Sequence, residues 1–262
     1  MNRFGAFAVH LGISLIIFVI LGYLILFHWY PDFFFASDGG WQGIRIVAFV
    51  DLVLGPVLTL VVFNQNKPRK ELQRDLGIIA AIQLSCLTAG TYVVYSERPI
   101  AMVYADGSFQ SMTIDDYQQV NQPVPEFGDK DGNPPYWVTV HLPEDLEAQS
   151  KIRQRFLQKQ QPLKTASEYY TPFSVSDIDT LREGITREQM ERIGMEVFER
   201  FLEEHGGNLD DYAFLRFGTR YQPALLALRP VTGELFYLSL PLPGGHAPRL
   251  FSINGGHRCS LN

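Results

Sequence analysis

One acidic side chain, Asp51, lies in the middle of a long apolar run, where a charge is costly unless protein or water surrounds it. Polar side chains also lie inside the neighbouring runs, among them His10, Ser14, Gln83 and Thr88. Such a carboxylate could relay protons or dock a polar group of a partner, or it could be a hydrogen-bonded strut between helices. We favour the strut, because the apolar runs contain no second acid that could receive a proton.

The depth of these residues along ideal helices groups them into two layers. At a rise of about 1.5 Å per residue, Asp51, Thr88 and Ser14 fall near one depth. At the same rise per residue, His10 and Gln83 share a second depth, which is closer to the predicted cytoplasmic side of the helices. We therefore predict one polar layer around Asp51 and a second, separate layer around His10.

Three apolar runs must position these side chains: residues 4–30, 43–63 and 76–95. A helix of about 20 residues crosses a hydrocarbon core of about 30 Å, and each run reaches that length. The first run could instead be a cleaved signal peptide, but its apolar stretch 8–27 is longer than the usual h-region of about 7–15 residues. The sequence therefore predicts three transmembrane helices within residues 1–95.

Small residues indicate where these helices bend and where they meet other helices. Gly55-Pro56 lies inside the second run, and a proline there removes a backbone donor, so we expect a kink or a local opening. On the third run small side chains recur every four residues, at Gly77, Ala81, Ser85 and Ala89. Such a stripe favours close helix association, within this chain or with another membrane protein.

The positions of Lys and Arg predict the orientation, because basic residues near helix ends stay on the cytoplasmic side. Arg3 precedes the first run, and the loop before the third run holds Lys67, Arg69, Lys70 and Arg74. The segment 28–42 between the first two runs has no Lys or Arg. We expect a cytoplasmic N-terminus and, after three crossings of a bacterial inner membrane, a C-terminal domain in the periplasm.

Residues 96–262 form a chain long enough for one globular domain of different charge. They contain 16 Lys and Arg against 23 Asp and Glu, a formal charge of −7, whereas residues 1–95 contain 6 and 5, a charge of +1. Nucleic-acid binding needs a concentrated cationic face, and this acidic segment shows no basic block. We therefore predict no nucleic-acid partner.

The C-terminal segment combines the patterns of strands and helices. Asp106-Gly107 separates two short strand candidates, 101–105 and 108–113, and is typical of a type I′ hairpin turn. A helix is expected from Thr186, whose hydroxyl can form a capping box with Gln189, to Gly206-Gly207. Further segments complete an α+β domain with an antiparallel sheet: a helix over 144–160 and strands over 136–141, 213–216, 223–229 and 234–240.

Motifs for catalysis or for cofactor binding are missing from the sequence. Asp129-Lys-Asp131-Gly132-Asn133 alternates oxygen ligands as a calcium loop does, but the glycine and the final acid of such loops do not follow, and an exposed turn explains it better. Nucleotide, metalloprotease and hydrolase signatures are absent. We predict no catalytic, cofactor or metal site, although a triad could assemble from distant residues.

A set of short motifs lies within residues 3–105: Arg3-Phe-Gly-Ala-Phe7, His10-Leu11, Trp29-Tyr30-Pro31, Asp51-Leu-Val-Leu-Gly55-Pro56 with Thr59, Lys67-Pro-Arg-Lys-Glu-Leu72, Arg74-Asp75-Leu76, Gln83-Leu84 and Tyr95-Ser-Glu-Arg98-Pro99. In these motifs the segment resembles the TfpX/TfpZ family of type IV pilin accessory proteins. Each motif is weak alone, and together they are specific.

This resemblance implies an inner-membrane accessory protein for type IV pilus biogenesis, which would act as a non-enzymatic chaperone or adaptor of the major pilin. The partners it implies are that pilin, the lipid membrane and, as a further possibility, proteins of the pilus assembly platform. Two alternatives stay open. A pilin-modifying enzyme would need a polar pocket in the C-terminal domain, and a periplasmic sensor would need a cytoplasmic output module.

Overall fold

The computed structural model describes residues 2–64, 67–127, 134–174, 184–240 and 250–252. The chain forms two compact units. The helical unit comprises Met1–Pro31 and Gly39–Arg98, and the sheet unit comprises Asp32–Asp38 and Pro99–Asn262. This division differs from the predicted boundary at 95/96 in one main respect, because the short segment 32–38 makes its contacts with the sheet unit.

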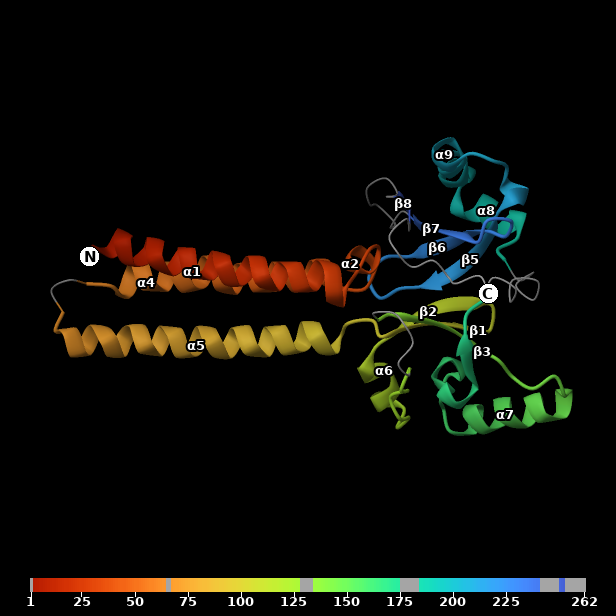
Figure 1. Ribbon diagram of the computed structural model, residues 1–262, viewed down its shortest axis with the longest axis horizontal. Coiled ribbons are helices and arrows are strands. Elements are labelled where there is room, and N and C mark those ends of the chain that lie inside the picture. Colours follow the sequence, from red (N-terminus) through yellow and green to blue (C-terminus); the bar gives the residue numbers. More distant parts are fainter. Residues whose placement is uncertain (1, 65–66, 128–133, 175–183, 241–249, 253–262) are drawn as a thin grey trace. The chain divides into compact units, whose positions relative to one another are not determined.

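Three long helices build the helical unit (Figure 1). The first consists of α1 (Arg3–Leu24) and the π turn η1 (Ile25–Trp29); the second of α3 (Gly40–Ala48), the π turn η2 (Phe49–Leu54) and α4 (Gly55–Val62); the third is α5 (Arg69–Ser96). Each is long and apolar enough to cross a membrane. Helices are suited to the lipid interior because their backbone N–H and C=O groups form hydrogen bonds within the helix.

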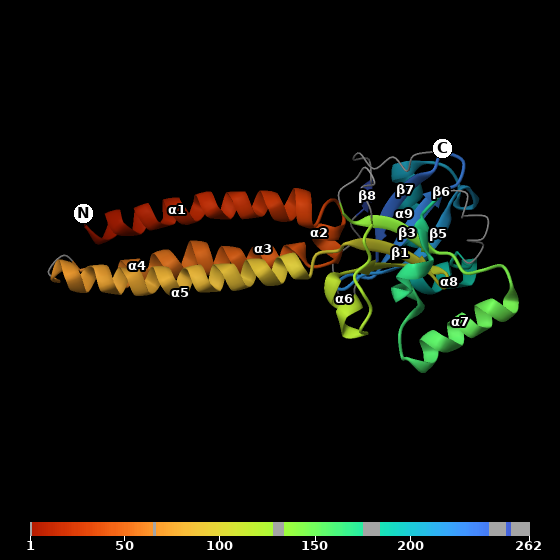
Figure 2. The ribbon, with the colours of Figure 1, turned by 60° about the horizontal axis from the view of Figure 1, so that its bottom comes forward.

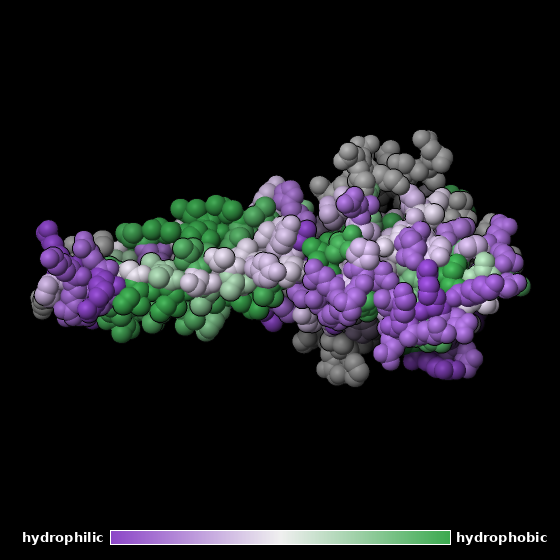
Figure 3. Space-filling model, turned by 90° about the horizontal axis from the view of Figure 1, so that it is seen from below, coloured by the Kyte–Doolittle hydropathy of each residue, from purple (hydrophilic) through white to green (hydrophobic). Residues whose placement is uncertain are grey.

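The second helix holds the other two together. α1 packs against α4 and η2, and α5 packs against α3, α4 and η2. Figure 2 shows the three helices running side by side. Apolar side chains cover the outer surface of this unit, and hydrophilic residues gather at the end that holds the N-terminus (Figure 3). This distribution agrees with the predicted membrane region, while insertion into a membrane stays a prediction.

A single sheet of eight strands forms the sheet unit, in the order β4-β3-β1-β2-β5-β6-β7-β8. The strands are β1 (Ala101–Ala105), β2 (Ser108–Met112), β3 (Tyr136–Val140), β4 (Tyr170–Pro172), β5 (Ala213–Gly218), β6 (Ala224–Arg229), β7 (Glu234–Ser239) and β8 (Leu250–Ser252). The predicted antiparallel sheet is wrong in two places, because β1 pairs with β3 and β2 pairs with β5 in parallel. The sheet is therefore mixed.

Helices cover one face of this sheet, which we call the α9 face. They are α6 (Ile114–Gln119), α8 (Arg187–Ile193) and α9 (Met195–His205), and a further helix, α7 (Leu146–Gln158), lies outside both core clusters. A core cluster joins Phe198 and Phe201 of α9 to Phe214 on β5. A second cluster joins Tyr117 of α6 to Val103 on β1. Single 3₁₀ turns complete the unit at Leu163–Thr165, Ser167–Tyr169 and Leu209–Asp211.

The segment Asp32–Asp38, with the one-turn helix α2 (Phe34–Ser37), packs on the opposite face. The Phe33 ring stacks on Tyr237 with centroids 4.8 Å apart and meets Phe217 edge-on at 5.5 Å. The backbone N–H of Tyr221 donates to the Ser37 carbonyl at 3.0 Å. A segment predicted only to connect two membrane helices is therefore part of the core of the sheet unit.

Two local motifs predicted from the sequence are present in the sheet unit, and one predicted helix is not continuous. The hairpin at Asp106-Gly107 is confirmed, since both residues adopt positive φ as a type I′ turn requires. The Thr186/Gln189 capping box is also present. The single helix expected after Thr186 is wrong, because Gly194 at φ 117° separates α8 from α9.

Candidate functional site

A chain of hydrogen bonds links all three long helices inside the helical unit. Gln83 of α5 lies at its centre, where Nε2 donates to Asp51 Oδ1 at 2.7 Å and Oε1 lies 2.8 Å from His10 Nε2. The other imidazole nitrogen of His10 lies 2.5 Å from Thr59 Oγ1. Ser14 Oγ donates to Asp51 Oδ1 at 3.5 Å and lies 3.4 Å from Gln83 Nε2. We call these five residues the polar network.

The donors of the polar network point in one direction. The amide of Gln83 donates to Asp51, so its oxygen must accept, and His10 Nε2 carries the hydrogen. With a neutral imidazole, Nδ1 then accepts from the Thr59 hydroxyl. The bonds thus run from Thr59 through His10 and Gln83 to the Asp51 carboxylate, an order in which each bond can polarise the next.

Asp51 is the most enclosed member of the polar network. It is 1% exposed, and Ser14 is equally buried, so both groups depend on protein partners. Oδ1 accepts from Gln83 and from Ser14, whereas Oδ2 has no hydrogen-bond partner among the described residues. This geometry is that of an interhelical connection through one carboxylate oxygen, as a strut requires.

Gly55 and Pro56 make room for the polar network. A Cβ at Gly55 would overlap the side-chain amide of Gln83, so a larger residue there would force that amide to move away from its present position. Pro56 is the second residue of α4, which follows directly on the wide turn η2 that contains Asp51. The expected local opening is this π turn, since such turns accommodate the donor that a proline lacks.

The structure unites the two predicted layers and leaves out one residue. Gln83 reaches from His10 to Asp51, which Cα depths alone could not indicate because a glutamine side chain extends along its helix. Thr88 is exposed and makes no hydrogen bond to the polar network. It lines an apolar hollow of about 370 Å³ between α1 and α5.

Thr59 is the member that the sequence prediction missed. It is 4% exposed and bonds His10. Its spacing was a usable signal, because Asp51, Gly55 and Thr59 recur every four residues and therefore share one face of a helix.

The predicted basic loop lies at the start of α5. Lys67 Nζ pairs with Asp75 at 2.8 Å and lies 3.8 Å from Glu71, and Arg74 lies 3.6 Å from Asp75. The hydrogen bond to Asp75 raises the pKa of Lys67, which keeps the amine charged. Arg69 and Lys70 are exposed, so the loop still presents cationic side chains to solvent.

Metal chemistry finds no support in the part of the chain that the structure describes, where no three metal-ligating side chains lie together. The calcium-like sequence 129–133 lies outside the described residues.

Comparison with known proteins identifies relatives in Dichelobacter nodosus. The fimbrial assembly proteins of serogroup E1 and serogroup I are each 31% identical over 121 residues, 45% of this chain. The fimbrial assembly protein of serogroups C1 and C2 is 32% identical over 108 residues, which are 41% of this chain and 82% of that relative. No protein-family model and no solved structure matches the chain.

The chain spans about half the length, 47%, of the serogroup E1 and I proteins. Its match covers more than two thirds of the serogroup C1 and C2 protein at over 30% identity. The chain therefore belongs to the family of fimbrial assembly proteins.

Proposed function

We propose that this protein serves type IV pilus biogenesis from the bacterial inner membrane, as a non-enzymatic chaperone or adaptor of the major pilin. Membership of the fimbrial assembly family is the observation that supports a role in pilus biogenesis. The resemblance of residues 3–105 to the TfpX/TfpZ proteins supports the more specific role of a pilin accessory protein. Proteins of the assembly platform are the second class of partner.

An open helix face supports direct contact with another membrane segment. Gly77, Ala81, Ser85 and Ala89 of α5 are all exposed, so the small-residue stripe is not used for packing inside this chain. A Cβ added at Gly77 would meet no atom within 4 Å. Stripes of this kind let a second helix approach closely in a membrane, where dispersion contacts drive association. The occupant that we propose is the apolar helix of the pilin.

The polar network then has a structural role. It fixes α1, the second helix and α5 against one another, because Gln83 bonds residues from both other helices. A rigid bundle presents the α5 stripe without further ordering on binding, which lowers the entropic cost of association. Asp51 is, in this proposal, a strut behind the contact surface.

A pulse-chase experiment in cells that lack the protein tests this function. An adaptor should lengthen the life of unassembled pilin or raise pilus number, while the intact mass of pilin stays unchanged. Complementation with the wild-type chain should restore both quantities. A mass change of pilin that depends on this protein would instead establish the alternative, a pilin-modifying enzyme. Normal pilus number and normal pilin lifetime without the protein would contradict both.

A further inference from the structure

A hollow of about 460 Å³ opens on the α9 face between the two core clusters. Its floor is the short parallel pairing of β2 with β5, where Ser108 aligns with Arg216 and Gln110 with Gly218. α9 covers Phe214 of β5, but the next two residues on the same face, Arg216 and Gly218, are exposed.

The walls of the hollow are mainly apolar, with a few polar groups at the rim. Ile193 of α8, Leu225 of β6 and Leu240 supply apolar surface. Amide groups come from Gln110 and from Gln189, and Gln110 Nε2 donates to the Ser108 hydroxyl at 3.2 Å. Its size falls in the range of about 300–1,000 Å³ that ligand sites occupy.

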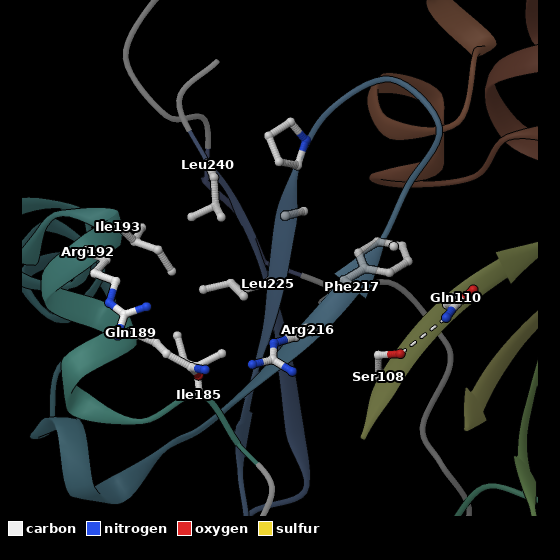
Figure 4. A pocket seen from close by; sticks show the side chains of 13 residues that line it. Ser108, Gln110, Ile185, Gln189, Arg192, Ile193, Arg216, Phe217, Leu225 and Leu240 are labelled. Atoms are coloured by element: carbon white, nitrogen blue, oxygen red, sulfur yellow. Dashed lines mark hydrogen bonds between the residues drawn. The ribbon is translucent and has the colours of Figure 1, made fainter. Parts of the chain in front are cut away.

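Arg216 is the unusual group in this hollow. Figure 4 shows its side chain between Gln189 of α8 and Ser108 of β2. The structure records no hydrogen bond or ion pair of its guanidinium with any described residue, and the described residues that line the hollow include no Asp or Glu. Arg192 at the edge differs, because it pairs with Glu188 at 2.5 Å. Among the described residues that line the hollow, Arg216 is therefore the cation that no acidic side chain pairs with, on a unit that is acidic as a whole.

We propose that this hollow binds a peptide segment in which one carboxylate lies between apolar side chains. A guanidinium offers two parallel N–H donors that match a carboxylate. One free cation suits a single negative charge, and the apolar walls suit the side chains on either side of it. Gln110 and Gln189 can bond the backbone of the segment. The assignment of that segment to the pilin head rests on the proposed function.

Fluorescence polarisation with the full chain in lipid nanodiscs tests the site, since detergent could itself fill an apolar hollow. The first probe is a labelled, end-capped peptide with one glutamate between phenylalanine and leucine. The second replaces glutamate by glutamine, and the third keeps glutamine but has a free C-terminal carboxylate after leucine. Tighter binding of the first probe than of the third shows that the site takes the carboxylate of a side chain. Tighter binding of the third shows that it takes the carboxylate of a chain end.

Substitutions at Arg216 locate the binding. R216Q should weaken binding of the preferred carboxylate peptide at least about ten-fold, the loss expected for a charged bidentate contact, and R216K should fall between R216Q and wild type. The matched control is R187Q, because Arg187 is an exposed residue of α8 that does not line the hollow. An unchanged unfolding midpoint of R216Q shows that the domain is intact.

Three results would overturn the site: equal affinity for carboxylate and glutamine peptides, equal loss in R216Q and R187Q, or no binding to wild type. A photoreactive residue at Gln189 in cells separates this proposal from the function. If pilin is captured at Ala81 of α5 but not at Gln189, the hollow is not its site and the function stands. If pilin is captured at neither position while the peptides bind, the hollow binds carboxylates and its assignment to pilin is wrong.

Discussion

At the scale of residues, we predict that Asp51 stabilises the helical bundle as a strut between its helices. Its Oδ1 atom accepts hydrogen bonds from α5 and α1. Replacement by leucine should reduce the stability of the bundle by about 1–2 kcal/mol, the range for interhelical hydrogen bonds in membranes. Asp51→Asn should cost less, because an amide retains the accepting oxygen. The measurement is the midpoint of unfolding by sodium dodecyl sulfate in mixed micelles.

Thr88→Val is the matched control for Asp51→Leu, since Thr88 is exposed and lies outside the polar network. A strut is refuted if the two variants are equally stable. Pilus number adds a second criterion: an Asp51→Asn protein of normal stability that no longer supports pili would make Asp51 a contact residue. If the Asp51→Asn protein has normal stability and supports a normal number of pili, Asp51 is neither a contact residue nor a strut.

Gly55 gives a second prediction at this scale. Gly55→Ala forces the Gln83 amide to move, and the loss of its hydrogen bonds to Asp51 and His10 should destabilise the bundle by about 1–2 kcal/mol. Gly12→Ala is the control, because a Cβ there meets nothing within 4 Å and alanine is the better helix former. The same unfolding assay applies. Equal effects of the two substitutions would show that Gly55 does not make room for Gln83.

At the scale of elements, the segment 32–38 places the buried carboxyl group of Asp38 against the sheet unit, where Ser111 of β2 bonds it. Asp38 is 2% exposed and accepts from Ser111 and, at 2.5 Å, from Ser37. Burial raises the pKa of Asp38, while those hydroxyls and Arg220 oppose the shift, and Tyr237 faces the same group. The protonated form is therefore favoured in the folded state more than in the unfolded state.

This shift predicts how the stability of the sheet unit depends on pH. A raised folded-state pKa gives stability that is complete below the unfolded value of about 3.9 and is lost as pH rises through the folded value. Asp38→Asn lacks that loss, so the stability of wild type relative to the variant should fall as pH rises above about 4, the ordinary pKa of a carboxyl group. Thermal unfolding followed by fluorescence measures the difference. A difference independent of pH would contradict it.

The elements also show how far sequence reasoning reaches. Helices and hairpins follow from local pattern, so the three apolar helices and the Asp106-Gly107 turn were predictable. The parallel pairing of β2 with β5 was not, because the paired residues lie far apart in the sequence and no turn joins them. In the polar network, residue types were predictable, whereas the reach of the Gln83 side chain required the structure.

At the scale of the whole molecule, the chain passes between its two units three times, after Pro31, Asp38 and Arg98. A pilin with a membrane helix and a periplasmic head could therefore be held at two places by one chain. Two linked contacts raise the effective concentration of the second, so each can be weak while the pair binds firmly. An adaptor that must later release its pilin would benefit from this arrangement.

The orientation of the molecule is directly testable. In a chain whose cysteines Cys86 and Cys259 are replaced by serine, Lys70→Cys should be shielded from a membrane-impermeant maleimide added to the periplasm, and Tyr221→Cys should react. Both positions are exposed in the structure, so burial would not explain protection. Labelling of both cysteines, or of Lys70→Cys alone, would overturn the predicted topology.

Direct contact with pilin is the central claim, and photocrosslinking in the native membrane measures it. A photoreactive residue is placed at Ala81 on the α5 stripe, with Val61 of α4, 75% exposed, as the control. We expect mass spectrometry to find pilin adducts at Ala81 and none at Val61. Adducts at Ala81 with only this protein itself, or only with assembly-platform proteins, would contradict the adaptor.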